Sequence, residues 1–336
     1  VVTIDPARRL AGALGMAELG NEPRRVSARR LAGAGIEARG ELWAMMLDPK
    51  RTFDELIGRL APDERTREEI LANGIYRELS SAVAGSQEFT AIAKLYDLDR
   101  DGGFDAIVLD TPPSRNALDF INAPARLTQF FDGRTARALR APTGLAARLV
   151  GRGTSTAFAV LRRVTGVDLL VEIRTFLAAL GGLVDGFGER AAGVAALLHD
   201  PATAVVLVSL PEAEPVDEAI AFAGELARAE MPVGAVIVNR MHADPIPPAD
   251  LAERLSGRLG PRLAERVVAG VRDHEILAAR DRRGLDRLEA ALGPAAFVRV
   301  PELAGDVHDL RGLARVAAHL FDQGKSSPRP GVETGA

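Results

Sequence analysis

Short apolar runs alternate with longer amphipathic stretches along this 336-residue chain. The runs are almost continuously apolar and rich in β-branched residues, which is typical of parallel strands that helices cover on both faces. They lie at Val1–Ile4, Ala106–Leu109, Ala204–Leu210, Ala235–Val238 and Phe297–Val300. Between the third and fourth runs, Val216, Ile220 and Ala223 recur at helical spacing, which indicates a βαβ unit with parallel strands. The pattern predicts an α/β fold: a parallel sheet flanked by helices.

Two long stretches contain no strand-like run and carry helical periodicity instead. In the first, Thr52 and Glu55 have the spacing of a helix-capping box, and apolar residues then repeat at i, i+3, i+4 and i+7. Both stretches lie between predicted strands. We therefore expect one α-helical subdomain inserted into the sheet core, at roughly residues 45–100 and 116–200.

Length and composition fit one globular domain with a short tail. Hydrophobic residues make up 47% of the chain, which is enough to bury a large core. We expect a single domain over residues 1–322. Residues 323–336 are rich in Pro, Gly and Ser, so we expect them to be disordered.

Charge and cysteine content narrow the functional classes. A net charge of −4 argues against nucleic-acid binding driven by bulk electrostatics. The chain has no cysteine, which excludes disulfides, thiolate metal sites and a cysteine nucleophile. No stretch resembles a signal peptide, and no apolar run approaches the roughly 20 residues of a membrane-spanning helix. The expected location is the cytoplasm.

Polar residues follow three of the predicted strands. Asp5 follows the first run, and Asp110 follows the second within "FDAIVLDTPPS". Ligands of parallel sheets bind beyond the carboxyl ends of the strands, where a carboxylate can bind Mg²⁺ or orient water. Asn239 and Arg240 follow a later strand, and an amide can recognise a base edge through one donor and one acceptor. Each residue could instead be a helix cap or a turn residue.

Taken together, four segments resemble one family. "VTIDPARRL", "LDTPPSRNAL", "LVSLPEAEPVDEA" and "VIVNR" are similar to segments of the ArsA-type, anion-transporting ATPases, and the likeness extends over most of residues 1–322. That family includes arsenite-pump ATPases and targeting factors for tail-anchored membrane proteins. The resemblance implies a P-loop NTPase fold, Mg²⁺-dependent ATP hydrolysis, and a nucleotide-sandwiched homodimer or paralogue dimer.

The resemblance also implies roles for individual residues. Asp5 would position the hydrolytic water, and Asp110 would bind Mg²⁺ directly or through water. Asn239, together with Arg240, would contact adenine. The loop that would flank the base consists of Pro301, Glu302 and Leu303.

One defining element of the family, its glycine-rich phosphate loop, has no match. The Gly-Lys-Ser at residues 324–326 is not such a loop, because His319 stands where the pattern needs glycine and no strand precedes it. In the family this loop comes just before the segment that matches Val1–Leu10. We therefore expect the chain to begin inside a longer protein. By itself it should bind ATP poorly and hydrolyse it negligibly, whereas the intact protein should do both.

The expected partners follow from the same resemblance. A hydrophobic client or membrane-associated protein would bind the helical subdomain. Because the chain has no cysteine, we expect neither thiolate-bound arsenite nor zinc. The arginine-rich stretch at residues 123–167 could line that client site or simply form solvated amphipathic helices. A non-catalytic scaffold remains the alternative function. A partitioning ATPase that acts on DNA or membrane is a third reading, which the acidic balance and large helical insertion disfavour.

Overall fold

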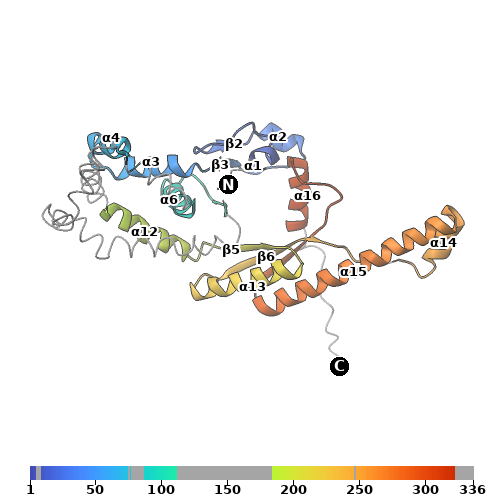
Figure 1. Cartoon of the computed structure of the whole chain (residues 1–336). Helices are drawn as coiled ribbons and strands as arrows, with labels where there is room; N and C mark the ends of the chain where they lie inside the picture. Colours follow the sequence, from blue (N-terminus) through green and yellow to red (C-terminus); the bar gives the residue numbers. More distant parts are fainter. Residues whose placement is uncertain (5–8, 75, 77–86, 112–183, 246, 322–336) are drawn as a thin grey trace, which may run out of the picture. The chain divides into compact units, whose positions relative to one another are not determined.

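The computed structural model describes residues 1–4, 9–74, 76, 87–111, 184–245 and 247–321 (Figure 1). Several predicted features lie outside this part: Asp5, residues 116–183 of the helical subdomain with the arginine-rich stretch at 123–167, and the tail at 323–336. The chain divides into two compact units. Unit 1 comprises Val1–Leu10, Ala17–Val26 and Glu41–Asp200, and unit 2 comprises Ala11–Met16, Ser27–Gly40 and Pro201–Ala336. The short helix α1 (Arg9–Ala13) is divided between them.

Unit 1 contains a four-stranded sheet in the order β2–β3–β1–β4. Its strands are β1 (Val2–Thr3), β2 (Arg24–Arg25), β3 (Trp43–Met46) and β4 (Leu109–Asp110). β1 pairs in parallel with β3 and with β4, and Thr3 stands directly opposite Asp110. β2 pairs antiparallel with β3. The carboxyl ends of β1, β3 and β4 therefore lie at one edge of the sheet.

The helices of unit 1 pack on one another. They are α3 (Pro49–Leu60), α4 (Glu64–Ala72), α6 (Gln87–Arg100) and α12 (Val184–Leu198). α3 contacts α4 and α6, and α6 contacts α12. Lys94 of α6 is only 5% exposed, and its ammonium lies 3.1 Å from Oε2 of Glu55 on α3. A buried cation needs such a partner, so this ion pair fixes how α3 and α6 meet.

One local prediction in this region is wrong, the capping box. The first helix, α3, starts at Pro49, close to the expected start of the helical subdomain at roughly residue 45, and residues 45 and 46 belong to strand β3. The capping box is absent. Asp48 already caps α3 by accepting from the backbone N–H of Arg51, so Thr52 and Glu55 are inside the helix and bond to Asn21 instead.

Unit 2 contains a parallel sheet in the order β5–β6–β7. Its strands are β5 (Val205–Ser209), β6 (Val233–Met241) and β7 (Ala296–Pro301), and its helices are α2 (Ala28–Gly33), α13 (Ala213–Arg228), α14 (Leu251–Leu259), α15 (Pro261–Leu292) and α16 (Leu310–Phe321). The predicted βαβ unit is confirmed, since α13 connects the parallel strands β5 and β6. A strand occurs at each of the five predicted runs, but with other bounds. β4 begins only at Leu109 and includes Asp110, and β6 continues through Asn239 and Arg240 to Met241.

Helices cover the two faces of this sheet unequally. α13 and α15 contact each other and β6, while α16 contacts β7, and Figure 1 shows α16 on the opposite side of the strands. Val236 and Val238 are completely buried. On the other face of the same sheet, Val206 and Val208 are 49% and 67% exposed. The expected cover on both faces is therefore incomplete over β5 in the described part of the chain.

Helix α15 approaches the turn after β5 at a single glycine. A Cβ atom built on Gly284 would lie 2.0 Å from the carbonyl oxygen of Pro211, closer than any van der Waals contact allows. Gly270 lies in the same helix, is exposed, and has no atom within 4 Å of the corresponding position. Only glycine therefore permits the observed packing of α15 at residue 284.

We expect Gly284→Ala to lower the free energy of unfolding by about 1–3 kcal/mol, because a backbone carbonyl cannot move aside without shifting the helix. Gly270→Ala is the matched control and should raise it by up to about 1 kcal/mol, because alanine is the better helix former. Urea unfolding followed by circular dichroism measures both. Equal effects of the two substitutions would contradict the close approach at Pro211.

Candidate functional site

Asp110 ends β4 at the edge where the parallel strands of unit 1 have their carboxyl ends. The hydroxyl group of Thr3, on the adjacent strand, donates a 2.8 Å hydrogen bond to its Oδ2 atom. Thr3 is 2% exposed, whereas Asp110 is exposed. A buried donor therefore holds one oxygen of a solvent-facing carboxylate. The structure brings Thr3 and Asp110 together, while Asp5 lies outside the described residues.

A β-bulge in unit 2 contains Asn239 and Arg240. The register between β6 and β7 runs from Val238 opposite Arg299 to Met241 opposite Pro301, so β6 carries one extra residue there. Arg240 has a φ of 58°, which is unusual for a residue other than glycine, and its N–H donates to Oδ1 of Asn239. Bulges and such backbone angles often redirect side chains at binding sites.

The bulge meets the loop that follows β7. The backbone N–H of Glu302 donates to the carbonyl oxygen of Met241, and a guanidinium nitrogen of Arg240 lies 3.3 Å from Oε1 of Glu302. Pro301 is the last residue of β7, and Leu303, half-buried, follows Glu302. The predicted residues from the ends of β6 and β7 are thus neighbours in space.

His242 and Asp281, which the sequence did not indicate, support the residues at the ends of β6 and β7. Asp281 of α15 is completely buried, and its Oδ2 atom accepts from the backbone N–H and from Nδ1 of His242. Arg280 donates two further hydrogen bonds to Oδ1. The other ring nitrogen of His242 lies 3.1 Å from Oε2 of Glu302. The only sequence signal was an aspartate in an amphipathic helix, which does not indicate a partner 39 residues away.

The environment of Asp281 lowers the pKa of its carboxyl group. Burial by itself raises that pKa, but the hydrogen bonds from His242 and then from Arg280 outweigh it. A carboxyl group with a lowered pKa stabilises the fold above its unfolded pKa of about 4, and this contribution is lost as the pH falls through the lower folded value.

We therefore expect Asp281→Asn to reduce the loss of stability below about pH 4, because the variant has no charge to lose there. At neutral pH it should be less stable than the wild type by about 1.5–3 kcal/mol, since charge-assisted hydrogen bonds to a buried group are weakened. Urea unfolding between pH 2.5 and 7 measures both effects. Asp286→Asn, an exposed aspartate on the same helix, is the control. An unchanged acid slope in Asp281→Asn would contradict the assignment.

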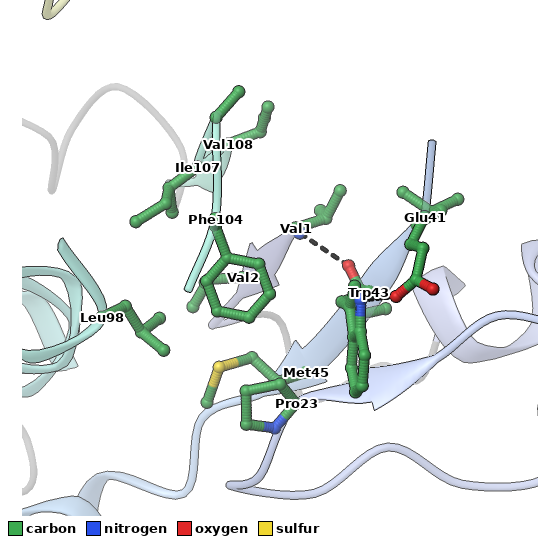
Figure 2. A pocket seen from close by; sticks show the side chains of 13 residues that line it. Val1, Val2, Pro23, Glu41, Trp43, Met45, Leu98, Phe104, Ile107 and Val108 are labelled. Atoms are coloured by element: carbon green, nitrogen blue, oxygen red, sulfur yellow. Dashed lines mark hydrogen bonds between the residues drawn. The ribbon is translucent and has the colours of Figure 1, made fainter. Parts of the chain in front are cut away.

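Unit 1 also contains an apolar pocket of about 260 Å³ (Figure 2). Its wall includes Trp43, Met45 and Phe104, and the rings of Trp43 and Phe104 meet edge to face with centroids 6.2 Å apart. The pocket lies at the amino-terminal ends of β1 and β3 and beside Val108, before β4 begins. It is therefore at the opposite end of these strands from Asp110.

The described part of the chain contains neither a cluster of metal ligands nor a membrane-spanning helix. No three His, Cys, Asp or Glu side chains among the described residues converge as metal ligands would. None of the described helices is both long and apolar enough to cross a bilayer.

The sequence is similar to one protein family and to several curated proteins. Residues 1–255 match the family model described as "Anion-transporting ATPase". Similar curated proteins include "ATPase BagA" of Mycobacterium tuberculosis and "Putative ATPase Mb3704" of Mycobacterium bovis, each 43% identical over 93 residues. Each match covers 28% of this chain and 26% of the relative, so the chain aligns with little more than a quarter of their length.

Proposed function

Because this chain belongs to the anion-transporting ATPase family, we propose that its strand ends bind ATP and Mg²⁺ for hydrolysis in the intact protein. Its fold is the α/β fold of P-loop NTPases, with parallel strands flanked by helices. Hydrolysis is proposed for the intact protein because the printed sequence has no glycine-rich loop in the context that phosphate binding needs.

The observation that supports this proposal most strongly is the bond between Thr3 and Asp110. A carboxylate at the carboxyl end of a parallel strand lies where such sheets bind ligands. The Thr3 hydroxyl uses Oδ2, so Oδ1 is the oxygen placed to take a further ligand. An exposed carboxylate with one oxygen held by a buried donor suits an ion that is otherwise bound by phosphate oxygens and water.

The residues present therefore fit Mg²⁺, with Asp110 as its carboxylate ligand directly or through water. When bound, the ion would neutralise charge on the β- and γ-phosphates. Asp5 is proposed to orient the attacking water from the segment after β1. Thr3 would keep the Asp110 side chain in one orientation.

The bulge and loop in unit 2 are proposed to bind adenine. The bond from Arg240 to Asn239 uses one lone pair of Oδ1 and neither N–H of the amide, so both N–H groups can donate to the base. Pro301, Glu302 and Leu303 would flank the ring, with Glu302 already paired to Arg240.

Three broader features belong to the same proposal. The protein would form a homodimer or a paralogue dimer that closes around nucleotide. Residues 45–100 and 116–200 would form a helical subdomain within a single domain of residues 1–322. Nucleotide-driven closure would change the affinity of that subdomain for a hydrophobic client or membrane-associated protein.

We expect Asp110→Asn to lower kcat of the intact protein by at least about 100-fold, because the amide binds Mg²⁺ far more weakly at the transferring phosphate. Asp105→Asn is the control, since Asp105 is an exposed aspartate that precedes the same strand. Release of phosphate from ATP at several Mg²⁺ concentrations measures both variants. Equal turnover in Asp110→Asn and the wild type would refute this role and favour the scaffold function.

A further inference from the structure

His242, the residue after β6, stands between carboxylates from two different elements. Its Nδ1 atom lies 2.7 Å from Oδ2 of Asp281 in α15, and its Nε2 atom lies 3.1 Å from Oε2 of Glu302 after β7. The two ring nitrogens of His242 thus each lie within 3.1 Å of a carboxylate oxygen. His242 therefore links a buried helix position to an exposed loop.

The helix end of this link is fixed. Asp281 is completely buried and is also bonded to Arg280 and to the backbone N–H of His242. One turn further along α15, Gly284 packs against the carbonyl oxygen of Pro211, which sets the position of the helix. His242 is thus held to Asp281 at two atoms, its backbone nitrogen and its ring.

The loop end is held less firmly: the backbone N–H of Glu302 makes one hydrogen bond, to Met241, and the Glu302 side chain lies near Arg240 and His242. The Glu302 side chain is 41% exposed, and its other charged partner, Arg240, is 64% exposed. A surface ion pair of this kind contributes little order on its own. His242 is only 16% exposed, so its contact is the better shielded of the two.

We propose that His242 and Asp281 are positioning residues that hold Glu302, and with it the loop after β7, in the conformation that accepts adenine beside Asn239. This inference rests on the proposed function, which assigns the base to that loop, and deepens it by naming two residues that act without touching nucleotide. Its consequence is base selectivity. Loosening the loop should weaken ATP binding more than GTP binding, because contacts to the phosphates stay the same.

Two substitutions at one position separate the two ends of the link. In His242→Asn the amide nitrogen can occupy the place of Nδ1, which keeps the contact with Asp281 and removes the one with Glu302. In His242→Gln the amide nitrogen can reach the place of Nε2, which keeps the contact with Glu302. His274→Asn is the control. His274 of α15 lies edge-on beside the His242 ring, so this variant changes a neighbouring histidine and leaves the contacts of His242 with Asp281 and Glu302 in place.

The dissociation constants of ATP and GTP are measured for the intact wild-type protein and for the three variants made in it, alongside hydrogen exchange of the amides around Glu302. We expect His242→Asn to bind ATP about tenfold more weakly, with a matching fall in its preference over GTP and faster exchange in the loop. His242→Gln should stay within about twofold of the wild type. His274→Asn should match the wild type.

Equal losses in His242→Asn and His242→Gln would overturn the proposal, because they would indicate a packing role for the ring. So would an unchanged ATP preference in His242→Asn. If the wild type binds neither nucleotide, the proposed function fails, and hydrogen exchange then decides the positioning role. Faster exchange around Glu302 in His242→Asn, but not in the other two variants, supports the positioning role. Unchanged exchange in His242→Asn overturns it.

Discussion

Parallel strand pairing is the constraint on which both candidate sites depend. It places the carboxyl ends of neighbouring strands at one edge, so residues that directly follow a buried strand gather there even when they are far apart in sequence. Thr3 and Asp110 meet in unit 1 for this reason, since they are directly opposed in the register of β1 and β4. Arg240 and Glu302 meet in unit 2 because β6 and β7 end side by side.

Hydrogen bonds to buried charged groups then decide which side chains around the strand ends have a fixed position. Asp281 can be completely buried because four donors surround it. Asp110 is exposed and has one oxygen held by a buried hydroxyl. This difference in hydrogen bonding agrees with the roles proposed for the two carboxylates. A fully bonded carboxylate can only position other groups, whereas a partly bonded one at the surface can still bind a ligand.

The five apolar strands could be predicted because burial on a parallel sheet demands an apolar run, and a polar residue at its end marks the edge. The polar residues at these strand ends, Asp110, Asn239 and Arg240, could be located from sequence order, and their roles stay predictions. β2 and β3 escaped prediction, because β2 is two exposed arginines and β3 is a short run next to a helix. The capping box failed because Asp48 supplied the cap first.

The supporting residues could not be predicted at all. Thr3 acts through strand register, His242 through a bulge that displaces it toward α15, and Asp281 through the contact that brings α15 to the sheet. Each depends on tertiary geometry that no local pattern encodes. Long-range positioning of this kind is where a single sequence carries least information.

The proposal that the strand ends bind Mg²⁺ and ATP is tested most directly by hydrogen exchange of the intact protein with and without Mg²⁺–ATP, because backbone amides report on each candidate site separately. If Asp110 binds Mg²⁺ and Asn239 binds adenine, exchange should slow at residues 109–111 and at residues 239–242 and 301–303. Unchanged exchange at 109–111 would contradict the role of Asp110, and unchanged exchange at 239–242 and 301–303 would contradict the adenine site.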